Sequence, residues 1–60
     1  MIDLTKLNGQ QFTLNEATIE TIEETPDTVI TLTTGRKLIV KESRQEVRNL
    51  VKLDRKDIFA

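Results

Sequence analysis

The chain has 60 residues, which is enough for one small domain. It has no cysteine and no histidine, so it offers no disulfide, no thiolate metal ligand and no imidazole for zinc or proton transfer. Nine basic and ten acidic residues leave a net charge of -1, which creates no long-range field for nucleic acid or anionic lipid. So small a domain buries little surface, which favours an oligomer or docking onto a larger partner.

The chain also carries no sign of a membrane segment or a secretory signal. Its longest uninterrupted apolar run is Leu38-Ile39-Val40, far shorter than a membrane span. The start, Met1-Ile2-Asp3-Leu4, lacks the basic residues and apolar stretch of a signal peptide. We therefore expect a cytoplasmic protein.

Two segments of different character make up a single domain over residues 1–60. Residues 1–42 are rich in Thr, Ile, Val and Leu, with turn residues at short intervals, which predicts an antiparallel β-meander of four to five strands. Residues 43–59 are charged and have apolar positions at helical spacing, which predicts one C-terminal α-helix. The expected fold class is α+β.

The first hairpin has two candidate registers. A two-residue turn at Asn8-Gly9 would place Phe12 on the opposite face of the sheet from Leu4. A three-residue loop over residues 7–9 instead pairs Leu4 with Phe12 and gives Gly9 the left-handed position of a bulged hairpin. We predict the second register, because it keeps the apolar side chains on one face.

The same pattern recurs later in the chain. A bulged turn with Gly35 left-handed places Ile30 opposite Leu38, and the proline turn before it places Ile22 opposite Ile30. Ile19 is out of phase with Ile22, which predicts a bulge or a late strand start.

Two apolar residues fall on the other face of the central strands. Val29 and Ile39 point away from the face that carries Ile30, Leu32 and Leu38. One interpretation is that the helix covers one face and a partner chain covers the other, with Val29 and Ile39 as the partner or oligomer face. The alternative is that the helix and loops cover both faces incompletely, since a single exposed isoleucine is common.

The helix has a clear start and an apolar stripe. Ser43 is a suitable N-cap, and Glu46 three residues later completes a capping box. The predicted stripe contains Val47, Leu50, Val51 and Ile58, with Leu53 widening it.

The opposite face of the predicted helix is basic, with Arg44, Arg48, Lys52 and Arg55 as a candidate contact surface. Such a face can bind the phosphates of a nucleic acid. The competing interpretation, a solvated helix face with interspersed Glu and Asp, is the more common one. Aromatic stacking on bases is also unavailable, because Phe12 is assigned to the core and Phe59 lies near the terminus. We therefore do not expect nucleic acid as the principal partner.

Catalysis is disfavoured by the residue types present. Without His, Cys or Tyr, the common nucleophile–base pairs cannot form, and the only serine, Ser43, is explained as a helix cap. The one dense acidic group is better interpreted as a solvated rim than as an acid–base pair; it contains Glu20, Glu23, Glu24 and Asp27. No feature calls for a cofactor, a metal ion or a small-molecule substrate.

A combination of short motifs over about residues 1–47 resembles a known family. The motifs are Leu4-Thr5-Lys6-Leu7-Asn8-Gly9, Phe12-Thr13-Leu14-Asn15, Ile19-Glu20, Thr25-Pro26-Asp27-Thr28-Val29-Ile30-Thr31-Leu32 and Val40-Lys41-Glu42-Ser43, together with Gly35. They resemble the small bacterial flagellar proteins called FlbD, or SwrD in swarming bacteria. The resemblance implies a cytoplasmic, non-enzymatic factor that supports flagellar motor function and swarming. Its expected partner is a second copy or a flagellar motor component, at the cytoplasmic side of the motor.

Two other resemblances lead to the alternative function, a small nucleic-acid-binding regulator. The strand–turn–strand–helix from Thr28 to Val51 is similar to the end of LytTR-type DNA-binding domains and to the RNA-binding regulator CsrA. Such binders place a basic run after the last strand, whereas here Glu42 interrupts Lys41-Glu42-Ser43-Arg44. The net negative charge also disfavours this alternative.

Overall fold

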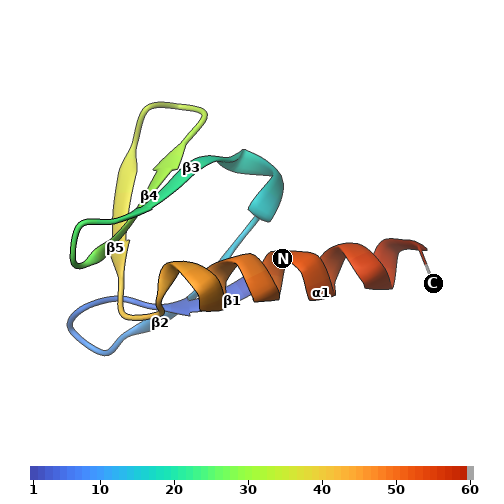
Figure 1. Ribbon diagram of the computed structural model, residues 1–60, viewed down its shortest axis with the longest axis horizontal. Helices are drawn as coiled ribbons and strands as arrows, with labels where there is room; N and C mark the ends of the chain where they lie inside the picture. The colour runs from blue at the N-terminus through green and yellow to red at the C-terminus, as the bar shows by residue number, and fades with distance from the viewer. Residues whose placement is uncertain (60) are drawn as a thin grey trace.

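The computed structural model describes residues 1–59, with side chains described for residues 1–54. The described residues form five strands, a short 3-10 helix and one α-helix (Figure 1). In chain order these are β1 (Ile2–Thr5), β2 (Gln11–Leu14), η1 (Glu16–Thr18), β3 (Ile19–Glu24), β4 (Thr28–Leu32), β5 (Lys37–Val40) and α1 (Arg44–Phe59). The expected α+β class, with antiparallel strands first and one helix last, is confirmed.

Both glycine turns have the predicted bulged geometry. In the first hairpin Leu4 pairs with Phe12, as the three-residue loop requires. Gly9 has a φ of 92° and Gly35 has a φ of 90°, which lie in the left-handed region that side chains with a Cβ rarely adopt. These two positions therefore set the register of their hairpins.

The second sheet contains three strands in the order β3-β4-β5. Ile30 on the central strand pairs with Ile22 on one side and with Leu38 on the other, as predicted. The register shifts between Ile19 and Thr21, which confirms the irregularity expected near the start of β3. One face of this sheet therefore presents an apolar row toward the core.

The meander is divided into two sheets, because β2 and β3 do not pair. Between them the side chain of Asn15 accepts a hydrogen bond from the N–H of Ala17 over 3.1 Å and starts η1. This turn carries the chain away from β2 and across to the second sheet (Figure 1). The two sheets are joined instead by an isolated bridge between Lys6, just after β1, and Val40 at the end of β5.

The helix begins at Arg44 and is capped from two directions. The Ser43 hydroxyl accepts a hydrogen bond from the Glu46 N–H over 3.2 Å and donates one to the Glu46 carboxylate over 3.3 Å. The Glu24 carboxylate, at the end of β3, accepts from the Arg44 N–H over 2.9 Å. Along its length α1 contacts β1 and β3, one strand from each sheet. No helix in the described chain is long and apolar enough to cross a membrane.

The core lies where the helix meets both sheets. Among the described side chains, the buried apolar ones are those of Ile2, Leu4, Ile30, Val40 and Val47. The prediction that Leu53 widens the apolar stripe is wrong, since its side chain is 59% exposed. Leu53 lies six residues after Val47, about 120° away around the helix, so it points away from the core. The side chain of Ile58, also assigned to this stripe, lies outside the described residues.

Candidate docking groove and basic helix face

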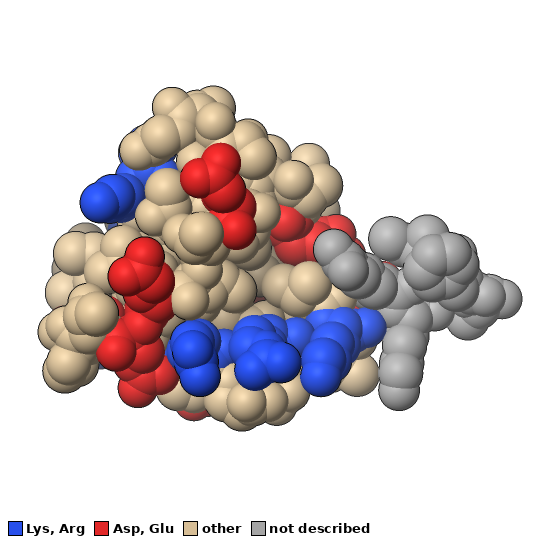
Figure 2. Space-filling model, turned by 45° about the horizontal axis from the view of Figure 1, so that its top comes forward, with Lys and Arg blue, Asp and Glu red and all other residues tan. Residues whose placement is uncertain are grey.

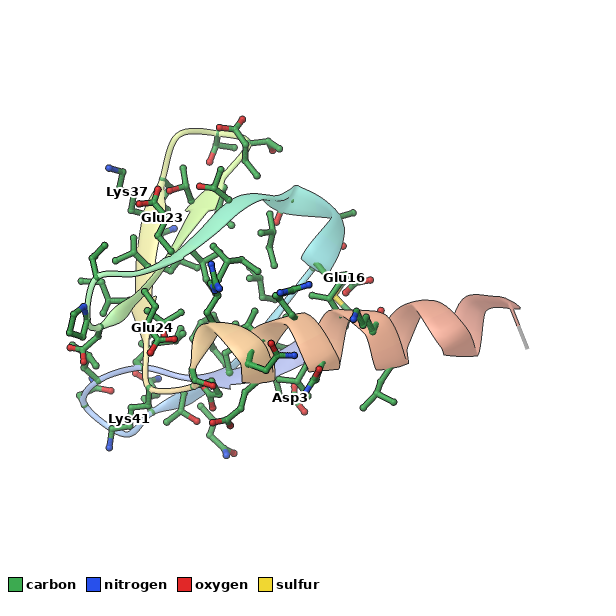
Figure 3. All side chains as sticks on the ribbon, in the orientation of Figure 1. Asp3, Glu16, Glu23, Glu24, Lys37 and Lys41 are labelled. Carbon is green, nitrogen blue, oxygen red and sulfur yellow. The ribbon has the colours of Figure 1, made fainter. Side chains whose placement is uncertain are left out.

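Val29 and Ile39 lie side by side on the second sheet. They are directly paired across β4 and β5. Glu23 on β3, labelled in Figure 3, pairs with Val29 from the other side. Val29 is half-buried, whereas Ile39 is 47% exposed. The apolar part of this face is therefore most accessible at β5, one of the two edge strands.

An open groove of about 350 Å³ runs beside β5. Its apolar lining comes from the first hairpin and from β5: Leu7, Phe12, Leu38 and Ile39. Its polar lining consists of Lys6, Asn8 and Arg36. We call this feature the β5 groove. Because the hairpin loop forms one side and the second sheet the other, the groove lies at the junction of the two sheets.

The charges around the β5 groove are of one sign. Lys6 and Arg36 line it, and both side chains are exposed. The Lys6 ammonium lies 5.8 Å from the centre of the Phe12 ring, within the range of a cation–π contact. Among its described lining residues there is no Asp or Glu. An apolar floor with a positive rim favours a ligand that is apolar in its centre and acidic at its edges.

Of the residues that line the groove, sequence reasoning found only Ile39 as a contact candidate. Phe12, expected in the core, packs against it but is only half-buried. Leu7 is 48% exposed within the first glycine turn. A large apolar residue in a three-residue loop is the signal that could have indicated this side of the groove, because turns rarely need one.

The predicted basic face forms a row along α1. Arg44, Arg48 and Lys52 are spaced one helical turn apart, and all three side chains are exposed. Figure 2 shows basic side chains aligned along the helix, with acidic side chains on the neighbouring surface. Arg55, the fourth predicted member, has a side chain outside the described residues. The structure brings the other three together on one surface.

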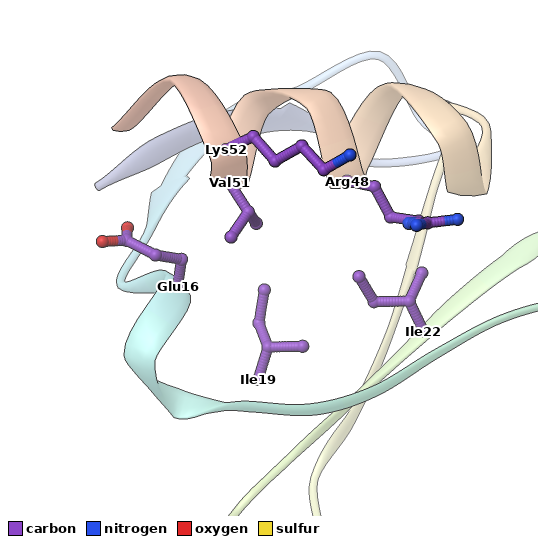
Figure 4. Close-up of a pocket in the computed structure, with 6 residues that line it drawn as sticks. All are labelled: Glu16, Ile19, Ile22, Arg48, Val51 and Lys52. Atoms are coloured by element: carbon purple, nitrogen blue, oxygen red, sulfur yellow. The ribbon is translucent and has the colours of Figure 1, made fainter. Parts of the chain in front are cut away.

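A second, smaller hollow of about 250 Å³ lies between α1 and β3 (Figure 4). Ile19 and Ile22 point into it from β3, and Val51 points into it from the helix. Its mouth carries charges of both signs, with Arg48 and Lys52 on the helix and Glu16 at the other end. This mixture gives the hollow no preference for ligands of one charge.

Glu16 is held by the amino group of Met1. The amino nitrogen lies 2.8 Å from an Asp54 carboxylate oxygen and 2.6 Å from a Glu16 oxygen. The hydrogen bond to Asp54 and the adjacent Glu16 carboxylate raise the pKa of this amino group above its ordinary value. The contact ties the start of β1, the turn η1 and the helix together, so we interpret these carboxylates as structural.

Glu42, the residue that interrupts the basic run, has a structural role as well. Its carboxylate accepts hydrogen bonds from the Thr5 N–H over 2.9 Å and from the Thr5 hydroxyl over 2.8 Å. Burial pulls the pKa of Glu42 upward, but these bonds, its own N–H and the charge of Lys41 outweigh burial and leave the pKa below its ordinary value. Glu42 thus fastens the β5–α1 connection to the end of β1.

The dense acidic group predicted from the sequence does not form a compact cluster. Glu24 caps the helix, while Glu20 and Glu23 are exposed along β3. Within the described part of the chain, no group of three or more Asp and Glu side chains is placed to hold a metal ion.

These features describe a small α+β domain whose most distinctive surface is an apolar groove with a basic rim. The family model for flagellar and swarming motility proteins, FlbD, matches residues 1–59. The chain therefore belongs to the FlbD family, which is defined by flagellar and swarming motility and not by an enzymatic reaction. Comparison with curated proteins and with solved structures gives no match.

Proposed function

We propose that this protein is a non-enzymatic flagellar motility factor that acts by binding another protein through the β5 groove. The observation that carries the proposal is the exposure of Leu7 and Ile39, at 48% and 47%, on opposite sides of one groove. Covering them with a partner removes apolar surface from water, which is the main driving force of protein association. Membership of the family supplies the process, flagellar and swarming motility.

The partner we propose is a flagellar motor component on the cytoplasmic side of the motor. A second copy of the chain is the other candidate. A symmetric pair places the same patch of both copies face to face, so the positive rims formed by Lys6 and Arg36 would repel each other. We therefore expect a folded monomer in light scattering of dilute protein, and a stable dimer would overturn the preference for a different partner.

Swarming on soft agar tests the proposed function directly. A strain that lacks the gene is complemented with the wild type, with Ile39→Thr, with Leu7→Thr or with Leu53→Thr. The first two variants remove apolar surface from the groove, and we expect each to reduce swarm expansion when expression is adjusted to give equal protein levels. Leu53 is the matched control, because it is also a large exposed apolar side chain, at 59%, but lies on the helix and does not line the groove. Full swarming with both groove variants would contradict the proposal.

The aligned basic row on α1 favours nucleic-acid binding as a second candidate function. If it is correct, mixed DNA or RNA binds the protein with an affinity that falls as salt rises. The double variant Arg48→Gln and Lys52→Gln would then lower both the affinity and its salt dependence. Our proposal predicts instead that the double variant swarms normally and that the wild type shows no salt-sensitive binding.

A further inference from the structure

The outer edge of β5 is only partly occupied. In the order β3-β4-β5 this strand is the last of its sheet, so one of its edges has no strand of the same sheet beside it. The first hairpin pairs with that edge through one bridge, between Lys6 and Val40. Beyond this bridge, residues 36–39 run along the β5 groove, to which Arg36, Leu38 and Ile39 contribute their side chains.

The hydrogen-bond pattern shows which backbone groups face that edge. The Leu32 N–H donates to the Arg36 carbonyl over 2.8 Å, so these two residues form a hydrogen-bonded pair of the ladder. Such pairs alternate along an antiparallel ladder, so Leu38 bonds to β4, whereas the N–H groups of Lys37 and Ile39 point away from it. Lys41 continues the alternation, because its N–H donates outward to the Thr5 carbonyl over 2.8 Å.

The side chains of β5 enclose the edge from both faces. Leu38 and Ile39 are neighbours in the sequence, so they point to opposite faces of the sheet, yet both line the β5 groove. The groove therefore wraps around the strand edge. An extended segment laid along it would place alternate side chains against Ile39 on one face and against Leu38 and Phe12 on the other.

The basic residues around the β5 groove indicate which kind of segment would bind along it. Lys6 and Arg36 line the groove, and the exposed Lys37 lies on the outward face beside it. A segment with acidic residues would find opposite charges on both faces of the edge. The β5 strand of a second copy would instead bring its own Arg36 and Lys37 against them.

We infer that the β5 groove takes an extended, acidic segment of a partner protein, which adds to the second sheet as a short strand along β5. The inference rests on the proposed function, since it names the chemistry of the partner at the same groove. Main-chain bonds to Lys37 and Ile39 supply the pairing, and alternating apolar side chains supply the contacts with the groove floor. Glu or Asp residues beside them match the basic rim.

Peptide selection on the full-length protein tests the chemistry. Random short peptides displayed on phage are selected on the wild type and, in parallel, on the double variant Lys6→Glu and Arg36→Glu. We expect the wild type to enrich peptides in which apolar residues alternate with Asp or Glu, and the variant to enrich Lys and Arg instead. Circular dichroism checks folding, and Arg36→Glu alone replaces the double variant if that variant does not fold. If selection on the wild type enriched neutral or basic peptides, or enriched no peptide at all, the inference would be overturned.

Nuclear magnetic resonance of the wild type tests the pairing and needs no variant. The most enriched acidic peptide is titrated into 15N-labelled protein, beside a control peptide with each acidic residue replaced by Lys. The acidic peptide should slow the hydrogen exchange of the Lys37 and Ile39 amides, while the Leu38 amide, already bonded to β4, changes little. The control should bind about tenfold more weakly or worse. Shifts confined to the helix, or groove binding without new protection at Lys37 and Ile39, would refute strand addition.

The two sets of experiments fail in different ways. If selected acidic peptides bind along β5 but the groove variants swarm normally, the groove chemistry stands and its role in motility falls. If the groove variants lose swarming but selection on the wild type yields no acidic peptide, the motility role stands and the acidic-strand inference falls.

Discussion

Glu42 joins two parts of the chain that are far apart in the sequence. Both of its carboxylate oxygens accept hydrogen bonds from Thr5 at the end of β1. In the sequence this residue only interrupts a basic run, because nothing local indicates a polar partner on the first strand. Roles of this kind depend on which segments meet, so they are visible only once the fold is known.

Replacing Glu42 should destabilise the protein in a pH-dependent manner. The folded-state pKa of Glu42 is lowered, so its contribution is complete above the ordinary glutamate pKa and is lost as pH falls through the folded-state value. We expect Glu42→Gln to lower the free energy of unfolding by about 1 kcal/mol near neutral pH, because a charged acceptor is replaced by a neutral amide. Urea denaturation at neutral and acidic pH measures the difference, which should shrink in acid.

Glu20→Gln is the control for this measurement. Glu20 is exposed on β3, so its replacement should leave the free energy of unfolding nearly unchanged at neutral pH. If the difference in unfolding free energy between the wild type and Glu42→Gln grew as the pH fell, the assigned role of Glu42 would be contradicted.

Among the elements, the hairpins were the most predictable and the groove was not. The registers follow from keeping Leu4 and Phe12 on one face and from the need of Gly9 and Gly35 for a left-handed conformation. The groove depends on where the first hairpin meets β5. That contact comes from the turn at η1 and the bridge to Val40, and neither leaves a local signal in the sequence.

The basic face and the helix start were also predictable, because both are local. The row on α1 follows from a spacing of four residues, and the cap at Ser43 follows from the residue that comes three positions later. Sequence reasoning missed the second cap, in which Glu24 accepts a hydrogen bond from the Arg44 N–H. This bond is long-range, so only the packing of β3 against the helix start reveals it.

At the helix start we expect Ser43→Ala to lower the free energy of unfolding by about 1 kcal/mol, because the Glu46 N–H loses its side-chain acceptor. For a domain of this size, that loss lowers the midpoint of thermal unfolding by roughly 4–8 °C. Thermal melts followed by circular dichroism measure it. Ser43→Asp is the matched variant, because aspartate is also a good cap and should retain most of the stability. Equal losses in both variants would argue against capping as the cause.

For the whole molecule, stability depends on a small core that the helix completes. Val47 is the one fully buried helix side chain among those described, and it packs with residues of both sheets. A domain of this length has a free energy of unfolding of roughly 3–9 kcal/mol, so a single core residue matters. The junction between helix and sheets is therefore the part least tolerant of change.

Of the substitutions proposed for stability measurements, truncation of Val47 should lower the free energy of unfolding the most. Val47→Ala removes two buried methyl groups, and we expect it to lower the free energy of unfolding by about 2 kcal/mol. Urea denaturation measures the change, and Leu53→Ala is the control on the same helix, where the side chain is already exposed. A larger loss for Leu53→Ala than for Val47→Ala would contradict the position of the core.

The division of the strands into two sheets has a consequence for the lifetime of the protein in the cell. The strands of the two sheets pair only at the bridge between Lys6 and Val40. A segment bound in the β5 groove would contact both sheets and hold them together. Because a ligand that binds only the folded state stabilises it, the bound form would resist proteases better than the free form. The abundance of this protein would then follow that of its partner, so that unpaired copies are removed and the two remain in proportion.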